Sequence, residues 1–262
     1  MPAATEHPGP VVQAEHVSVR YGSRRHPHDA LRDVSFQVRQ GETLAVIGES
    51  GAGKSTLTRV VAGLEQPTGG QVRINGRIPV VRSGVISPVQ IVFQNPLLAL
   101  NPHCSVGASV AEPLRALPRR ARAERVAALV DAVGLNPRRA GERPGAFSGG
   151  QLQRLVLARA LAAEPQVLIC DEATSALDVS VQAQIVNLIL DLQATQNYAC
   201  LFVTHDLAAA RVVADQVMVL RQGRCLELAP AGQFFRQPSS DYARSLLTLS
   251  GNRPAHAHEE IL

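Results

Sequence analysis

Four residues at a fixed spacing could bind phosphate: Gly48, Gly53, Lys54 and Ser55 match the pattern G-x-x-x-x-G-K-S. A short apolar run precedes them and a segment of helical character follows, which is the context that this motif requires. Glycines let backbone N–H groups turn toward phosphate oxygens, and the start of a helix adds positive charge. We therefore predict a phosphate-binding loop made by Gly48, Glu49, Ser50, Gly51, Ala52, Gly53, Lys54, Ser55 and Thr56.

Lys54 is the only lysine of the chain, although lysine and arginine together number 26. A guanidinium is wider than an ammonium, planar and forked, so it does not fit a loop built around a compact point charge. We interpret the single lysine as a steric requirement of this loop. Ser55 is expected to offer its hydroxyl to Mg²⁺.

Two adjacent carboxylates, Asp171 and Glu172, follow the apolar run of "QVLICDEATSALD". Placing two carboxylates at the end of a buried strand is costly unless a cation or ligand compensates their charge. We expect Asp171 to hold Mg²⁺ through water and Glu172 to polarise an attacking water.

Strands and helices must alternate to position these groups. Period-two or fully apolar patterns predict strands, and apolar residues at helical spacing predict helices. We expect strands over 11–21, on both sides of Gly41, over 166–170 and over 199–206, a hairpin turning at Gly223, and helices over 123–135, 149–165 and 179–195. The pattern indicates an α/β core with an early β-rich part and a mid-chain helical part.

Composition limits the remaining classes. The chain has 262 residues, of which 45% are hydrophobic and 18% charged, so it is globular and long enough for one domain with subdomains. We find neither a bilayer-spanning run nor a secretion signal, and expect a cytosolic protein. The net charge of +4 comes from scattered arginines, which disfavours nucleic acid as a partner. Cys104, Cys170, Cys200 and Cys225 form no CxxC pair, so free thiols are expected.

The segment "FSGGQLQR" (147–154) resembles the LSGGQ signature of the ATP-binding-cassette (ABC) ATPases, with Phe147 in the leucine position. The resemblance covers about residues 11–247, with a helical subdomain at about 95–160 and flexible tails at 1–10 and 248–262. It implies a P-loop NTPase core of ABC ATPase type with an N-terminal antiparallel β subdomain and an inserted helical subdomain.

The same resemblance assigns roles to residues outside the phosphate loop. Tyr21 matches the aromatic residue that stacks on adenine, and since a ring face is recognised, Tyr21→Phe is expected to change little. Gln94 matches the Q-loop glutamine, implied to sense the γ-phosphate, to contact Mg²⁺ and to face a transmembrane partner. His205 matches the switch histidine, and the D-loop ends at Asp178. The signature itself, Ser148, Gly149, Gly150 and Gln151, is implied to grip ATP bound to a partner's phosphate loop.

Longer segments narrow the resemblance. "VFQNPLLALNPHCSVGASVAEPL" and "ICDEATSALDVSVQAQIVNLILDLQ" are similar to the oligopeptide, dipeptide and nickel importer ATPases, in particular the second ATPase of two-ATPase operons. The expected function is ATP hydrolysis that energises an importer of peptides, nickel or a metallophore. The expected partners are two permease subunits, a second homologous ATPase or another copy of this chain, and indirectly a solute-binding protein, at the cytoplasmic face of the inner membrane.

Two other classes stay open. An ABC ATPase acting on DNA or ribosomes shares all these motifs, but neither the inserted coiled coil of the repair relatives nor a second cassette is present. A P-loop kinase shares the Lys54 loop but gives no reason for the SGGQ segment.

Overall fold

A six-stranded sheet forms the centre of the molecule. The computed structural model describes residues 9–23, 26–175 and 177–249. In order across the sheet, the strands are β5 (Val89–Phe93), β6 (Val167–Asp171), β7 (Ala199–Thr204), β3 (Thr43–Ile47), β8 (Gln216–Arg221) and β9 (Arg224–Pro230). All neighbours pair in parallel except β8 and β9, which form an antiparallel hairpin. The carboxyl ends of the five parallel strands therefore meet at one edge, and β3 leads from there into the phosphate loop.

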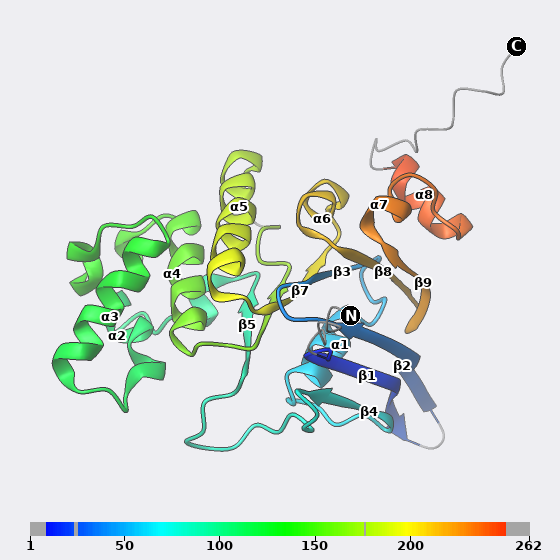
Figure 1. Ribbon diagram of the computed structural model, residues 1–262, viewed down its shortest axis with the longest axis horizontal. Helices are drawn as coiled ribbons and strands as arrows, with labels where there is room; N and C mark the ends of the chain where they lie inside the picture. Colours follow the sequence, from blue (N-terminus) through cyan, green and yellow to red (C-terminus); the bar gives the residue numbers. More distant parts are fainter. Residues whose placement is uncertain (1–8, 24–25, 176, 250–262) are drawn as a thin grey trace, which may run out of the picture.

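A second, antiparallel sheet covers one face of the first (Figure 1). Its strand order is β2 (His26–Val38), β1 (Val12–Ser23) and β4 (Gly69–Ile74). Helix α1 (Lys54–Val61) lies between the two sheets, with Leu57 and Val61 fully buried. This apolar layer joins side chains from β1, β2 and β3 into one core, so the start of α1 is held from both sides.

Helices cover the opposite face of the central sheet (Figure 1). They are α5 (Val179–Gln196), α6 (Leu207–Val213), α7 (Ala231–Phe234) and α8 (Asp241–Leu249). Apolar side chains of α6, α7 and α8 pack on β3 and β8, and those of α5 pack on β6 and β7. The two buried cysteines, Cys170 and Cys200, lie in this second layer as free thiols, as the sequence predicted.

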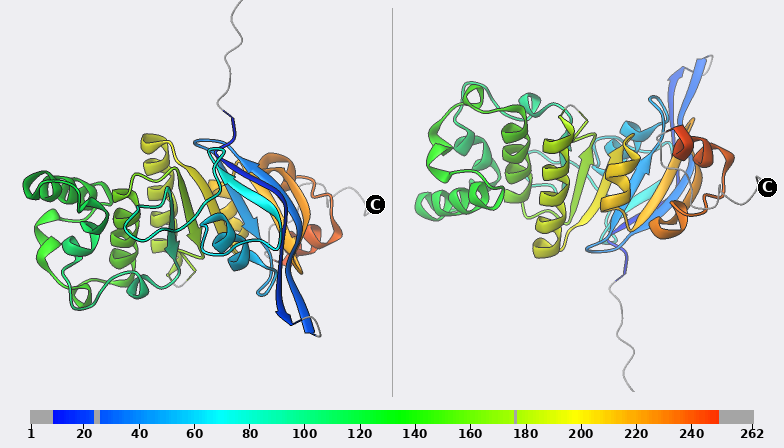
Figure 2. Two further views of the ribbon diagram at one scale, coloured as in Figure 1. Left: turned by 90° about the horizontal axis from the view of Figure 1, so that it is seen from below. Right: turned by 90° about the horizontal axis from the view of Figure 1, so that it is seen from above.

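A helical lobe is inserted between β5 and β6 and extends from one end of the molecule (Figure 2). Its helices are α2 (Val106–Val110), α3 (Arg119–Ala132) and α4 (Gly149–Ala162), joined by the 3-10 turns η1 (Pro96–Leu98), η2 (Glu112–Leu114), η3 (Pro137–Gly141) and η4 (Pro144–Ala146). Helix α4 is buried on most sides and connects the lobe to the sheet, because it packs on both α3 and β5.

The predicted fold class is confirmed: a P-loop core carries an antiparallel sheet and a helical insertion. Two details differ. Helix α3 begins at Arg119, before the expected start at 123, because the Arg- and Ala-rich turn after Pro118 continues the helix. Strands β4 and β5 and helices α2, α6, α7 and α8 were not among the expected elements. The expectation of flexible tails at 1–10 and 248–262 falls mainly on residues outside the described ranges.

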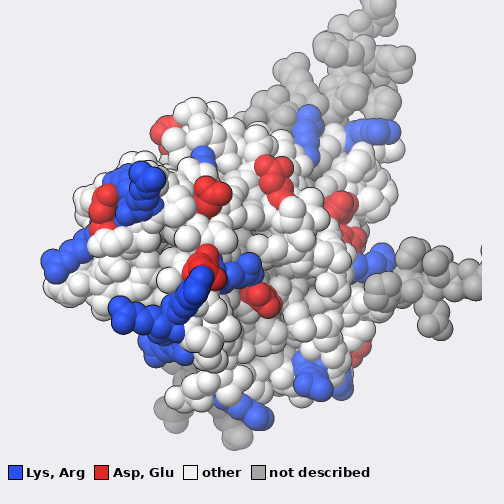
Figure 3. Space-filling model, turned by 60° about the vertical axis from the view of Figure 1, so that its left-hand side comes forward, with Lys and Arg blue, Asp and Glu red and all other residues white. Residues whose placement is uncertain are grey.

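On the face of the helical lobe shown in Figure 3, carboxylates lie among the arginines. Several pair with carboxylates, as in Arg159 with Glu112 at 2.6 Å and Arg120 with Glu124 at 2.9 Å. Along the described part of the chain, no helix combines the length and the hydropathy that crossing a bilayer requires.

Candidate functional site

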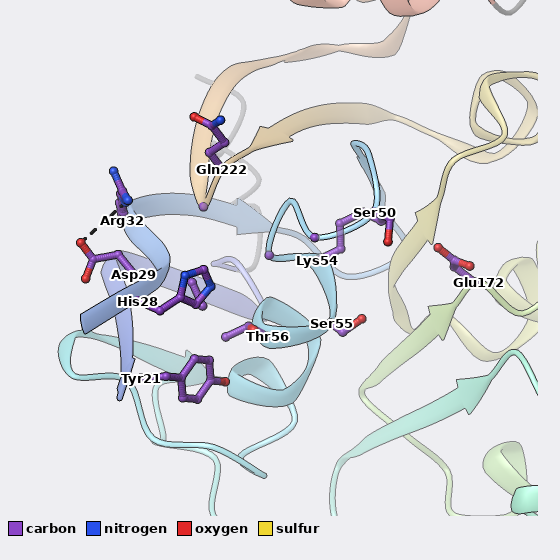
Figure 4. A pocket seen from close by; sticks show the side chains of 14 residues that line it. Tyr21, His28, Asp29, Arg32, Ser50, Lys54, Ser55, Thr56, Glu172 and Gln222 are labelled. Atoms are coloured by element: carbon purple, nitrogen blue, oxygen red, sulfur yellow. Dashed lines mark ion pairs between the residues drawn. The ribbon is translucent and has the colours of Figure 1, made fainter. Parts of the chain in front are cut away.

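The phosphate loop opens into a cavity of about 560 Å³ between the two sheets (Figure 4). Tyr21 and His28 lie at one side, Glu172 at the other, and Lys54 and Ser50 between them. The full lining consists of Tyr21, His28, Asp29, Ala30, Arg32, Ser50, Gly51, Gly53, Lys54, Ser55, Thr56, Glu172, Gln222 and Gly223.

Two glycines give the loop its close approach to neighbouring backbone. Gly53 has φ +105°, and a Cβ there would lie 2.5 Å from the carbonyl oxygen of Ala30. A Cβ on Gly48 would lie 2.2 Å from the carbonyl oxygen of Leu220. Any larger residue must displace backbone at both positions. The turn between β8 and β9 closes the same side, because Gly223 N–H donates to the carbonyl oxygen of Ala52 at 2.9 Å.

Lys54 points its ammonium back into the loop. Its Nζ donates to the carbonyl oxygens of Gly48 at 2.7 Å and of Glu49 at 3.0 Å, and the residue is only 7% exposed. Burial lowers the pKa of Lys54, while the carboxylates of Glu172 and Asp171 act against that shift. The ammonium group is therefore largely shielded from water, although Lys54 lines the cavity.

The two carboxylates meet the loop from β6. Asp171 Oδ2 lies 3.3 Å from Thr58 Oγ1 of α1. Burial raises the pKa of Asp171, and the neighbouring charge of Glu172 adds to the rise. Glu172 lies directly beyond the strand with φ +52°, a conformation that non-glycine residues adopt rarely and that directs its side chain into the cavity. Its Oε1 lies 3.6 Å from Nδ1 of His205, which follows β7.

The remaining wall comes from the β1–β2 hairpin. Tyr21 and His28 are cross-strand partners, so their side chains lie on the same face and both line the cavity. On the next pair, Arg20 and Asp29 form an ion pair at 2.5 Å.

Several predicted site residues do not line this cavity. Gln94 is exposed at the end of β5, next to the helical lobe. Ser148 and Gln151 form a reciprocal capping box at the start of α4. Asp178 caps α5 by accepting a hydrogen bond from Val181 N–H at 3.0 Å. A Cβ on Gly150 would lie 2.5 Å from Val181 Cγ1, so the signature segment packs directly against the start of α5.

The motifs did not identify some residues that shape the site. Thr58 contacts Asp171, and its place one turn after Lys54 on the same helix could have indicated this. Gln153 is a buried amide on α4, 1% exposed, whose Nε2 donates to the carbonyl oxygen of Phe93 at 3.2 Å, directly before Gln94. A glutamine among apolar helix positions is a signal of a buried polar contact. No pattern in the sequence singles out His28.

A phosphate loop at the edge of a mainly parallel sheet, with paired carboxylates ending another strand of that sheet, defines a P-loop nucleoside triphosphatase. The family comparison makes this more specific. Residues 31–175 match the family model described as "ABC transporter", and the chain belongs to the ABC transporter family as an ABC-type ATPase that binds ATP.

Named relatives cover most of the chain. It is 46% identical over 227 residues to the "Di/tripeptide transport ATP-binding protein DppF" of Pseudomonas aeruginosa, covering 84% of this chain and 70% of that protein. It is 44% identical over 226 residues to the "Glutathione import ATP-binding protein GsiA" of Escherichia coli, covering 83% of this chain but 36% of the relative.

Solved structures share the fold. The cassette MJ0796, in a "dimeric structure of a post-hydrolysis state" bound to ADP and Pi, superposes with a TM-score of 0.73 at 28% identity and covers 84% of this chain and 98% of its own. CbiO1 of Clostridium perfringens, part of the ABC transporter complex cbiONQ, superposes with a TM-score of 0.78 at 25% identity and covers 93% and 98%.

Replacing Lys54 with arginine is expected to stop ATP hydrolysis. ATP binding should weaken roughly tenfold or more, which corresponds to the loss of one hydrogen bond to a charged group. The forked guanidinium cannot occupy the space between the carbonyl oxygens of Gly48 and Glu49. Titration calorimetry and a phosphate-release assay measure both effects. Arg59→Lys, the reverse exchange on the exposed side of the same helix, serves as control and should leave both unchanged. Normal hydrolysis by Lys54→Arg would contradict the steric explanation.

Replacing Asp171 with asparagine is expected to stabilise the nucleotide-free protein. A carboxyl group whose pKa is raised by folding destabilises the folded state once it is ionised. The stability gained by Asp171→Asn is therefore present near neutral pH and shrinks as the pH falls toward the ordinary pKa range of aspartate. We expect a rise in Tm of roughly 2–4 °C, the shift that about 1 kcal/mol produces in a chain of this size. Thermal melts at several pH values measure it, with Asp191→Asn on the exposed side of α5 as control. A lower Tm for Asp171→Asn at neutral pH would refute the prediction.

Proposed function

We propose that this protein is the ATP-hydrolysing subunit of a membrane importer for peptides. The observation that carries the proposal is the cavity that unites Lys54, Glu172 and the aromatic Tyr21 around the phosphate loop. Di/tripeptide and glutathione transport, in the names of the two relatives above, favour a peptide cargo. Nickel or a metallophore, the other cargo considered from the sequence, has no comparable support.

Within the site, the amides of the loop from Gly48 to Thr56 and the Lys54 ammonium would hold the terminal phosphates of ATP. Glu172 would accept a proton from the attacking water, and its positive φ holds the carboxylate in the cavity for that role. His205, 3.6 Å from Glu172, is proposed to contact the γ-phosphate and to keep the carboxylate oriented. Tyr21 would stack on the adenine.

The residues around Asp171 fit Mg²⁺. A hydroxyl from Ser55 and a carboxylate from Asp171 are the oxygen ligands that Mg²⁺ prefers. Burial raises the pKa of Asp171, and a bound cation would offset the cost of keeping this carboxylate ionised. When bound, Mg²⁺ would neutralise charge on the phosphates. Gln94, exposed and outside the cavity lining, is retained as a proposed further ligand.

The separation of Ser148, Gly149, Gly150 and Gln151 from this cavity supports a site shared by two cassettes. We propose that two cassettes pack head to tail, each signature segment and Asp178 loop facing the partner's phosphate loop. A homologous second ATPase is the proposed partner, with a second copy of this chain as the alternative.

The permease subunits are proposed to dock beside Gln94. A hollow of about 790 Å³ lies there on the helical lobe, lined by Leu97, Leu98, Arg115, Arg122 and Arg159 among others. Leu97 and Leu98 are adjacent and 54% and 82% exposed, and exposed apolar side chains that lie together mark interaction surfaces. The protein would then sit peripherally at the cytoplasmic face of the inner membrane, linked to a solute-binding protein only through the permeases.

Glu172→Gln is expected to keep ATP affinity while slowing hydrolysis roughly 10²–10⁴-fold, because an amide hydrogen-bonds the water but accepts no proton. With Mg²⁺ and ATP, this variant should accumulate as a dimer in light scattering, and without nucleotide it should be monomeric. Glu124→Gln on exposed α3 is the matched control. Hydrolysis at the normal rate by Glu172→Gln would remove Glu172 from the proposed role, and a monomer under all conditions would argue against a homodimeric sandwich.

Affinity purification of the tagged chain from detergent-solubilised membranes of its native host tests the partners. We expect two permease subunits and a second ATPase, and we expect Leu98→Asp to lose the permeases while binding ATP normally, because the charge would be buried in the proposed interface. Leu249→Asp, at a leucine of α8 that is 86% exposed and lies outside the lobe, is the control. Recovery of ribosomes or DNA instead would favour the non-transport class.

A further inference from the structure

The hydroxyl of Tyr21 has a partner. It donates a hydrogen bond to Glu65 Oε2 at 2.6 Å, although the two residues are 44 positions apart in the sequence. The expectation that only the ring face of Tyr21 matters leaves this hydroxyl without a role. In Figure 4 the hydroxyl points away from β1 toward the ribbon of α1.

Glu65 belongs to a short connection between α1 and β4 that is held at both ends. At one end, the N–H groups of Leu64 and Glu65 donate to the carbonyl oxygen of Arg59, in the last turn of α1, at 2.9 and 3.3 Å. At the other end, Thr68 N–H donates to the carbonyl oxygen of Ser18 on β1 at 2.8 Å. The carboxylate of Glu65 therefore has a defined position relative to α1, the helix that begins at Lys54.

Tyr21 itself lies near the end of a strand. β1 ends two residues later at Ser23, and Tyr21 is 37% exposed. On the hairpin, His28 is the cross-strand partner of Tyr21, and a tyrosine side chain turns about two bonds. The hydrogen bond to Glu65, together with an interaction of the same hydroxyl with Thr56 in the first turn of α1, fixes the outer end of the ring, so that the ring plane is set before a ligand arrives.

We propose that Glu65 is a positioning residue for the nucleobase: its carboxylate orients the Tyr21 ring against which the base stacks. Glu65 does not line the nucleotide cavity, so its effect must pass through Tyr21. Because α1 carries Lys54 at its start and the Glu65 connection at its end, it holds the base platform at a fixed separation from the phosphate loop. This inference rests on the proposed function, namely that the cavity binds ATP.

A double-mutant cycle on the full chain tests the proposal. Calorimetry gives the Kd of ATP and of inorganic tripolyphosphate, which has no base, for the wild type, Glu65→Ala, Tyr21→Phe and the double variant. Each single variant should raise the Kd of ATP roughly two- to fivefold, as expected for a partly exposed hydrogen bond to a charged group. The double variant should bind ATP no more weakly than the weaker single variant, and no variant should change the Kd of tripolyphosphate.

Two further variants keep the test sharp. Glu65→Gln retains an acceptor oxygen without the charge and should lose less ATP affinity than Glu65→Ala. Gln66→Ala, the next residue of the same connection, is the matched control and should bind like the wild type. Unchanged binding of tripolyphosphate also reports that the phosphate loop has folded in each variant.

The proposal is overturned if Glu65→Ala binds ATP like the wild type, if the effects of the two substitutions multiply in the double variant, or if tripolyphosphate loses affinity as ATP does. Failure of the proposed function has a different signature: a wild-type chain that binds neither ATP nor tripolyphosphate would refute the nucleotide site, and this inference with it.

Discussion

The site depends on how one ammonium group is buried. Lys54 sits at the start of α1 with its charge bound by two carbonyl oxygens of its own loop, where it is 7% exposed. Taking a charge out of water is costly, and here hydrogen bonds and the nearby carboxylates of Asp171 and Glu172 compensate the cost. The two carboxylates lie at the carboxyl end of β6, and the phosphate loop follows β3. Because β3, β7 and β6 are parallel, the carboxyl ends of these strands, and with them the two groups, lie at the same edge of the central sheet. The antiparallel sheet then confines α1 from the other side through the shared apolar layer.

Local patterns predicted the parts of the site that lie within one short segment. The phosphate loop and the Asp171–Glu172 pair are contiguous in sequence, each follows an apolar strand, and each was placed correctly beside that strand. Long helices were also predictable, since α5 carries a buried apolar face from Ile185 to Leu192 and begins directly after its capping residue Asp178. The start of α3 was less visible because exposed arginines and alanines continue a helix without contributing an apolar pattern.

Contacts between distant segments set the rest, and these leave little trace in a single sequence. Strand β4 opens with two glycines, which disfavour a strand, yet it pairs with β1 because β1 offers an unpaired edge. The Tyr21 hydrogen bond to Glu65 spans 44 positions, and the Gln153 bond to the Phe93 carbonyl spans 60. Hydrogen bonds of this kind form only once the fold has brought the two distant segments together, so neither partner is marked by its neighbours in the sequence. The family resemblance proposes Tyr21 as the residue that stacks on adenine, and only the three-dimensional arrangement reveals what holds its ring.

The bond from Gln153 also connects the two segments that lie outside the cavity. Gln153 is on α4, the helix that begins with the signature residues, and it holds the backbone directly before Gln94. A buried amide that lost this partner would carry the cost of an unsatisfied polar group, so α4 and the end of β5 are expected to move together. Gly150 at the start of α4 packs against Val181 at the start of α5. The N–H of Val181 in turn donates a hydrogen bond to Asp178, so α4, α5 and Asp178 are held together. In the proposed sandwich, the signature segment and the Asp178 loop face the partner cassette, and Gln94 lies beside the proposed permease site. The contacts of α4 with β5 and α5 therefore join these three segments directly. Their link to the chain's own phosphate site runs through the central sheet, where the β5 and β6 strands pair along their full length.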